Sequence, residues 1–240
     1  MKMKFFILLF CGLGLNISSA LAGIVINSTR VIYPEGKNEV TVRLESQNEH
    51  SSLVQSWIDN GNKNEEIKSI KVPFILLPPV TRIEPHQGQT LRISYLGEGF
   101  TLPADRESVF WLNVLDIPPK SSGNAENLLQ MAIRTRIKLF FRPASLESLS
   151  PAEAAEKLTW HVVKSKKSIM LEAENNSPFH ISITSIEATS GGRRVSAEGQ
   201  MIAPYAKATY VFPGKRFNLQ TFKYIYINDY GASIPIEKEI

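Results

Sequence analysis

The chain has very little cysteine: Cys11 is the only one among its 240 residues. It lies in an apolar run, residues 5–15, that follows two lysines and precedes Ala20-Leu21-Ala22, which is the pattern of a secretory signal peptide with a small-x-small cleavage site. We therefore expect residues 1–22 to be removed and the mature chain to begin near Gly23. Without cysteine, an exported chain has no disulfide to stabilise it and must bury a core.

Long hydrophobic runs and concentrated charge are also missing. The apolar segment at residues 5–15 is too short to cross a bilayer and no later stretch approaches that length, so we expect no membrane insertion of the mature chain. The net charge of the chain is only +4, and removal of the two leader lysines lowers it further. The basic residues are scattered and lack interleaved stacking aromatics, so we expect no nucleic-acid partner.

The motifs of common catalytic sites are absent from the sequence. The four histidines, His50, His86, His161 and His180, lie far apart and do not have zinc-site spacing. The sequence contains no G-x-S-x-G nucleophile turn and no glycine-rich phosphate loop. We therefore expect no enzyme, no cofactor and no metal site, and a binding or structural role is favoured. A catalytic site assembled from distant residues would leave no such motif.

Alternating apolar and polar residues follow the leader. Val40, Val42 and Leu44 alternate with polar residues, and the same period of two recurs at residues 91–95. Residues rich in glycine, proline and asparagine separate these segments. About seven or eight segments precede residue 142, which suits one immunoglobulin-like sandwich.

The composition changes near residue 143. Pro143 ends the preceding strand, and Ser150-Pro151-Ala152-Glu153 predicts a capping box with proline at the first helical position. Strands are predicted again at 159–163, 169–174, 180–187, 207–212 and 222–228. We therefore expect all-β architecture in two domains, residues 23–145 and 146–240; one long sandwich with a helical connector is the alternative.

Residues 128–142 form the longest predicted strand. Its odd positions are almost all apolar: Leu129, Met131, Ile133, Thr135, Ile137, Leu139 and Phe141. Opposite them lie the polar or basic residues Gln130, Arg134, Arg136, Lys138 and Arg142, with Ala132 and Phe140 as exceptions. Strands usually have about 5–6 residues, and a long apolar edge invites pairing with another chain. Two interpretations stay open: a strand that pairs with a partner, or a central strand with both neighbours in its own sandwich.

Several short motifs occur in one order along the mature chain. They are Thr29-Arg30, Ser56-Trp57-Ile58, Asp105-Arg106-Glu107-Ser108, Ile117-Pro118-Pro119, Arg136-Ile137-Lys138-Leu139-Phe140-Phe141-Arg142-Pro143 and Asn228-Asp229-Tyr230-Gly231. In these motifs the sequence resembles the PapD-like periplasmic pilus chaperones of the chaperone–usher pathway. The short connection from Pro119 to Leu128 contains no cysteine pair and is similar to that of the short F1–G1 loop subgroup.

The resemblance implies two immunoglobulin-like domains joined at an angle, with a cleft between them. It implies a periplasmic chaperone that binds, folds and caps pilus or fimbrial subunits by donor-strand complementation and delivers them to an outer-membrane usher. A self-paired oligomer would be one way to cap the strand in the free chaperone. The alternative is a structural pilus subunit or a carbohydrate-binding adhesin domain, although a subunit is expected to carry a disulfide and an N-terminal donor extension.

The same motifs imply roles for single residues. Arg30 and Lys138 match the two cations that hold the C-terminal carboxylate of the subunit. Leu129, Met131 and Ile133 match the alternating side chains that the donor strand inserts into the subunit's groove.

Glu107, Arg142 and Asp229 match an ion network between the two domains. A further expectation concerns the faces of the strand. Strict alternation places Lys138 and Met131 on opposite faces, so a bulge or a strong twist is expected if both residues meet the subunit.

Overall fold

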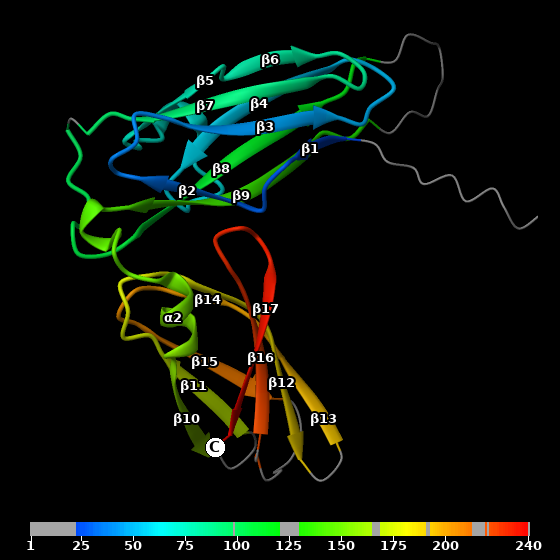
Figure 1. Ribbon diagram of the computed structural model, residues 1–240. Coiled ribbons are helices and arrows are strands. Elements are labelled where there is room, and N and C mark those ends of the chain that lie inside the picture. The colour runs from blue at the N-terminus through cyan, green and yellow to red at the C-terminus, as the bar shows by residue number, and fades with distance from the viewer. Residues whose placement is uncertain are drawn as a thin grey trace, which may run out of the picture.

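The computed structural model describes residues 23–97, 99–120, 130–164, 169–190, 193–212, 219 and 221–239. Figure 1 shows two lobes, one built from β1 to β9 and the other from β10 to β17, with helix α2 (Pro151–Glu156) near their junction. Each lobe has its own cluster of buried hydrophobic side chains. The predicted fold of two β-sandwiches is confirmed. No helix in the described ranges is both long and apolar enough to span a bilayer.

The first domain packs two sheets face to face. One has the order β1 (Ile24–Ile26), β3 (Val40–Ser46), β7 (Gly88–Tyr95), β5 (Phe74–Leu77); the other has the order β2 (Arg30–Pro34), β9 (Ile133–Arg142), β8 (Ser108–Ile117), β4 (Ser52–Asp59), β6 (Val80–Ile83). A short 3-10 helix, η1 (Ile67–Ser69), lies between β4 and β5. Apolar side chains from alternate positions of both sheets, such as Leu44 and Leu112, fill the space between them.

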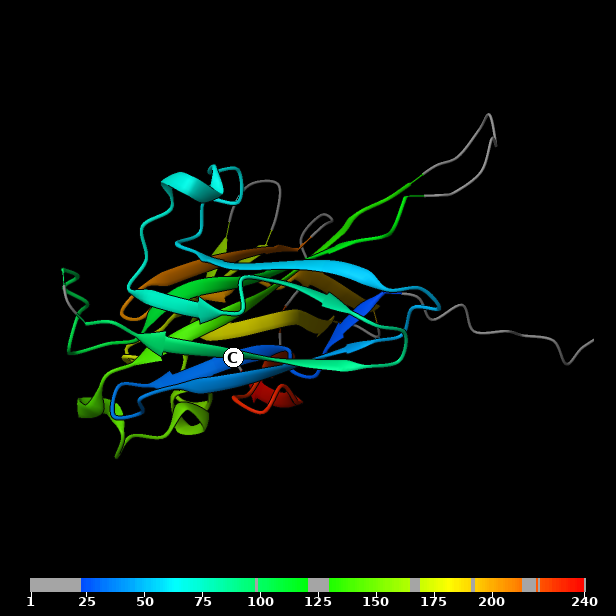
Figure 2. The same cartoon turned by 90° about the horizontal axis from the view of Figure 1, so that it is seen from above.

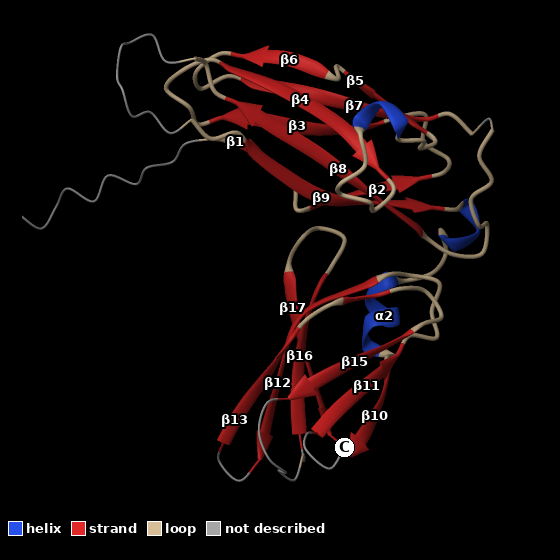
Figure 3. Ribbon diagram, turned by 180° about the vertical axis from the view of Figure 1, so that it is seen from behind, coloured by secondary structure: helices blue, strands red, loops and turns tan. Residues whose placement is uncertain are grey.

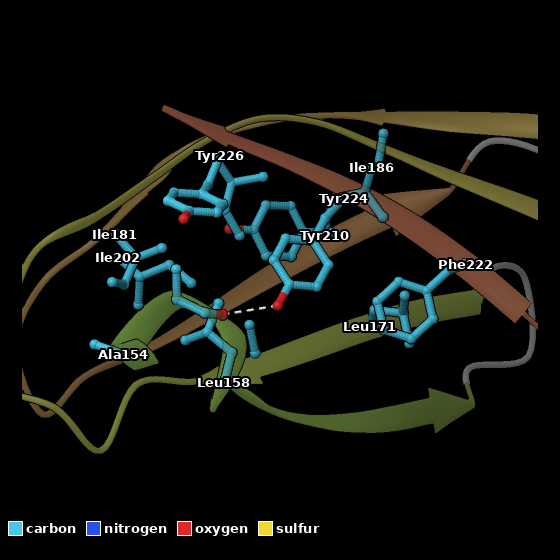
Figure 4. Close-up of a cluster of buried hydrophobic side chains, with 14 of the residues drawn as sticks. Ala154, Leu158, Leu171, Ile181, Ile186, Ile202, Tyr210, Phe222, Tyr224 and Tyr226 are labelled. Atoms are coloured by element: carbon cyan, nitrogen blue, oxygen red, sulfur yellow. Dashed lines mark hydrogen bonds between the residues drawn. The ribbon is translucent and has the colours of Figure 1, made fainter. Parts of the chain in front are cut away.

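The second domain is a smaller sandwich. One sheet has the order β10 (Thr159–Lys164), β11 (Ile169–Glu174), β15 (Lys207–Phe212); the other has the order β13 (Arg193–Glu198), β12 (Ile181–Ser190), β16 (Thr221–Ile227), β17 (Ser233–Glu239), with β14 (Met201–Ile202) paired to β12. Figure 4 shows the core, where the Tyr224 hydroxyl donates a 2.7 Å hydrogen bond to the Ala155 carbonyl. This bond ties helix α2 to the sheet.

The connection between the domains follows the predicted capping box. After the 3-10 helix η2 (Ala144–Leu146), the Ser150 hydroxyl accepts a 3.3 Å hydrogen bond from the Glu153 amide, and Pro151 is the first helical residue. The serine half of the predicted capping box is confirmed, because the Ser150 oxygen satisfies an amide that has no partner within the helix, whereas the Glu153 carboxylate accepts a hydrogen bond from Lys157.

The strand content of the second domain exceeds the prediction. The five predicted strands are present within a few residues, but β13, β14 and β17 were not expected. Strand β17 lies at the edge of its sheet, paired only with β16 among the described strands, and contains Pro235 and charged residues. Such an edge strand buries little apolar surface, so its sequence lacks the strong alternation of an internal strand.

The longest predicted strand is too long at its start. Strand β9 begins at Ile133, and residues 130–132 do not belong to it. Its pairing with β8 begins with Asp116 opposite Ile133, and residues 130–132 take part in no strand pairing with the described strands. In Figure 2 the ends of β8 and β9 extend beyond the rest of the first domain.

Candidate functional site

Two cations meet where the two domains face each other. Strands β2 and β9 run parallel, and their register places Arg30 directly opposite Lys138. The Arg30 Nη1 donates a 2.8 Å hydrogen bond to the Ile227 carbonyl, and the Lys138 Nζ donates a 3.0 Å bond to the Ser182 hydroxyl. Both side chains therefore reach from the first domain to strands of the second. In Figures 1 and 3 the hairpin of β16 and β17 points toward this side of the first domain.

Neither cation has an anionic partner in direct contact. Within the described part of the chain, no carboxylate forms an ion pair with Arg30 or Lys138, and the buried Nε of Arg30 has no hydrogen-bond partner. Burial lowers the pKa of Arg30, opposed by the more distant charges of Asp229 and Glu107. Burial, and then the charge of Arg30, lowers the pKa of Lys138. Two partly buried cations held side by side favour an incoming anion.

Arg142 links the two domains. Its Nη2 donates to Glu107 Oε1 at 2.7 Å, and its Nη1 donates to Asp229 Oδ2 at 2.8 Å. The Glu107 Oε2 also accepts a 2.9 Å bond from the backbone amide of His180. The structure thus brings the predicted residues Glu107, Arg142 and Asp229 into contact and adds His180, which lies in the second domain.

The tip of the β16–β17 hairpin packs against Thr29, the residue just before β2. Gly231 has a φ of +84°, and a side chain there would collide with the Thr29 hydroxyl. Tyr230, beside it, is 96% exposed. A cavity of about 450 Å³ lies between the domains, with Arg30, Phe140 and Tyr230 among its lining residues. Arg30 therefore lies beside this cavity, whereas Lys138 is not one of its lining residues.

The outer part of β9 has one open edge. Strand β2 pairs with β9 only from Lys138 to Arg142, because the chain crosses to the other sheet at residues 27–29, between β1 and β2. Residues 133–137 are paired with β8 alone among the described strands. This open edge ends at Lys138, where the pairing of β9 with Arg30 of β2 begins.

The structure describes two of the three predicted donor side chains. Leu129 lies outside the described residues. Met131 and Ile133 are 63% and 51% exposed, whereas Leu139 and Phe141, further along the same face, are buried in the first domain. Among the described residues, neither Met131 nor Ile133 belongs to the core of the first domain or packs against it.

Strand β9 contains no bulge between its outer and inner parts. Its pairing with β8 is continuous from Ile133 to Phe141. Ile133 therefore lies on the face of Leu139, which is directed to the core, while Lys138 lies on the opposite face, toward the second domain.

Several contact residues gave no signal in the sequence. Ser182, Ile227 and His180 touch the predicted site residues only because the second domain folds back on the first. Asp59 is a second case: it is buried and binds two arginines of β9. Asp59 directly follows the Ser56-Trp57-Ile58 motif, but a local motif does not show that this acid pairs with a strand about 75 residues away.

Comparisons with known proteins cover nearly the whole chain. Residues 23–147 match the family described as pili and flagellar-assembly chaperone, PapD N-terminal domain, and residues 153–238 match the PapD C-terminal domain. The probable fimbrial chaperone YadV of Escherichia coli is 41% identical over 222 residues, which cover 90% of this chain and 89% of the relative.

Solved structures of chaperones also match the chain. The crystal structure of the Pseudomonas aeruginosa CupB2 chaperone superposes with a TM-score of 0.76 at 35% identity, covering 90% of this chain and 100% of that one. The SafB chaperone of Salmonella enterica, solved in complex with the SafA pilin, gives a TM-score of 0.76 at 28% identity, covering 93% and 99%. The chain belongs to the PapD family of pilus-assembly chaperones, which are not enzymes.

Proposed function

We propose that this chaperone binds a pilus subunit by adding the open edge of β9 to it, and that Arg30 and Lys138 bind the subunit's C-terminal carboxylate. The observation that carries the proposal is the partly buried pair of cations without a carboxylate, located at the end of that open edge. An added strand gains backbone hydrogen bonds along the edge, and Met131 and Ile133 offer exposed apolar side chains to it. Leu129 would extend the same set.

The cations also select the direction of the added strand. A strand on the open edge occupies the line of β2, just before Arg30, and β2 runs parallel to β9. If the added strand is parallel too, its C-terminal carboxylate ends beside Arg30 and Lys138. If it were antiparallel, its N-terminal ammonium group would face two cations, which is unfavourable.

This arrangement removes the need for a bulge. The carboxylate is the end of a backbone and lies in line with the strand, whereas the apolar side chains project from one face. Lys138 and Ile133 can therefore contact the same subunit although they lie on opposite faces of a regular strand.

The remaining parts of the proposal follow from family membership. We place the chaperone in the periplasm, give it an outer-membrane usher as a second partner, assign it to the short F1–G1 loop subgroup and divide it at residues 145 and 146. The ion network of Glu107, Arg142 and Asp229 would hold the angle between the domains. The alternative role as a pilus subunit or adhesin has no support, because the relatives are chaperones.

Arg30→Ala and Lys138→Ala test the anchor. Each variant is co-expressed with a pilus subunit that forms a complex with the wild-type chaperone, and complex recovered from the periplasm is measured. We expect a loss of at least about tenfold, since a hydrogen bond to a charged group contributes about 1.5–3 kcal/mol. Arg43→Ala is the control, because Arg43 is an exposed cation of the same domain, paired with Glu45. Thermal melting checks that both variants are folded. If both folded variants recover as much subunit as the wild type, the assignment is overturned.

A further inference from the structure

A buried carboxylate lies on the face of the first domain that is opposite its core. Asp59, at the end of β4, is 0% exposed, although its neighbour Ile58 is the residue that points into the core. Charged side chains are rarely fully buried unless they are paired. The partners of Asp59 therefore indicate what it does.

Two arginines from the even-numbered face of β9 bind this carboxylate. Arg136 forms a two-pronged contact, with Nε donating to Asp59 Oδ2 at 3.1 Å and Nη2 donating to Oδ1. The Arg134 Nη2 lies 3.5 Å from the same Oδ2. Asn113 of β8 bridges them: its Nδ2 donates to Asp59 at 2.8 Å, and its Oδ1 accepts from Arg134 Nε at 2.9 Å. Strands β4, β8 and β9 are thus joined through one carboxylate.

Two tryptophans cover the arginines. The Arg134 guanidinium lies 4.8 Å from the centre of the Trp57 ring, and that of Arg136 lies 4.6 Å from the centre of the Trp111 ring. The planar guanidinium groups are therefore fixed both by their hydrogen bonds and by the ring faces. Gly61 completes the cluster: its amide donates to Asp59 Oδ1 at 2.7 Å, and its φ of +115° brings the backbone close to Trp111.

The contacts of Asp59 and Asn113 reach the outer part of β9, which has few other contacts within the first domain. Residues 133–137 pair with β8 on one side only, and Ile133 on their core-directed face is half exposed. Ile137 packs against the core, so apolar packing holds the inner end of this segment but not Ile133. On the face of β9 opposite the core, side-chain hydrogen bonds from Arg134 and Arg136 to Asp59 and Asn113 hold this segment.

We propose that Asp59 is a positioning residue for the donor strand: it holds Arg134 and Arg136 so that the outer edge of β9 is extended before a subunit arrives. This inference rests on the proposed donor role of β9. An edge that is already ordered loses less conformational entropy when a partner strand pairs with it. Asp59 also provides a carboxylate partner for Arg134 and Arg136, whereas Arg30 and Lys138 form no ion pair with a carboxylate of the described residues and remain the anion site.

Asp59→Asn tests the inference, because the amide keeps the shape of the carboxylate and removes its charge. Backbone hydrogen exchange of the free mature chain is followed by mass spectrometry. We expect residues 133–137 to exchange at least about tenfold faster than in the wild type, while β3 and β7 exchange as before. Complex with the co-expressed pilus subunit should also dissociate at least about fivefold faster. Asp105→Asn is the matched control, since Asp105 is an exposed acid of the same domain paired with Arg106.

Unchanged exchange in residues 133–137, or equal acceleration in β3 and β7, would overturn the positioning role. If Asp59→Asn does not fold, Arg134→Gln replaces it, because that change keeps the pair of Arg136 with Asp59 and should accelerate exchange of the same segment more weakly. The exchange experiment needs no subunit. Faster local exchange together with full recovery of subunit by the Arg30 and Lys138 variants would therefore refute the anchor assignment and leave intact the ordering of β9 by Asp59.

Discussion

The basic side chains on one face of β9 differ mainly in whether a carboxylate lies beside them. Asp59 binds Arg134 and Arg136, and Glu107 and Asp229 bind Arg142. Lys138 and the adjacent Arg30 have a hydroxyl and a carbonyl as their described partners. The placement of acids therefore leaves two of these cations available for an anion. Such free cations, held by the fold, are the kind of site that recognises a carboxylate.

Acid should weaken the hold of Asp59 on β9. Burial alone would raise the pKa of its carboxyl, but hydrogen bonds from Arg136, Asn113 and the Gly61 amide outweigh burial and lower it below the ordinary value of 3.8. A carboxyl with a depressed pKa adds stability at pH values above 3.8, and this stability is lost as the pH falls further.

We therefore expect the wild type to exceed Asp59→Asn in free energy of unfolding at pH 6, with the difference shrinking below pH 3.8. Urea unfolding at a series of pH values measures it. A difference that stays constant down to pH 2 would contradict the role of the charge.

The roles of some of these residues could be predicted from the sequence, and those of others could not. Arg30 and Lys138 were predicted because both lie in motifs shared with a family. Asp59 follows the Ser56-Trp57-Ile58 motif but was not singled out. Its importance comes from burial and from pairing between strands, and neither is visible in a local pattern of residues.

At the scale of elements, β9 has two halves with different tasks. Its inner half is central, lying between β2 and β8, and buries Leu139 and Phe141. Its outer half is an edge with exposed Ile133. The interpretation as a central strand is therefore correct for the inner half, and the outer half offers the edge for the partner pairing that we propose.

The two halves should respond differently to truncation. We expect Leu139→Ala to lower the free energy of unfolding by about 2–5 kcal/mol, because it leaves a cavity in the core. We expect Ile133→Ala to change it by less than about 0.5 kcal/mol, as for other exposed sites, yet to reduce the recovery of a co-expressed subunit. Urea unfolding and co-purification measure these effects. Equal losses of stability would contradict the division of the strand.

The strand itself could be predicted because its alternation is strong, but its start could not. A strand ends where its neighbour ends, and the extent of β8 is set by long-range pairing. Strand β17 was missed for a related reason: Pro235 and its charged neighbours hide an edge strand that is held by β16.

At the scale of the whole molecule, the site belongs to neither domain alone. The first domain supplies Arg30, Lys138 and the open edge; the second supplies Ser182, Ile227 and the hairpin that carries Asp229. The fold of each domain follows from alternation and turns, so the sequence predicted it. The way the domains face each other depends on a few contacts distant in sequence, and only the resemblance to a family indicated it.

The central claim is that Arg30 and Lys138 bind the end of a subunit chain. The most direct test is to extend the co-expressed pilus subunit by two residues at its C-terminus and to measure its recovery with the wild-type chaperone. We predict a loss of at least about tenfold, because the carboxylate no longer lies beside the cations when the strand is in register. The same extension at the subunit's N-terminus should have no effect. Unchanged recovery of the C-terminally extended subunit would contradict the account.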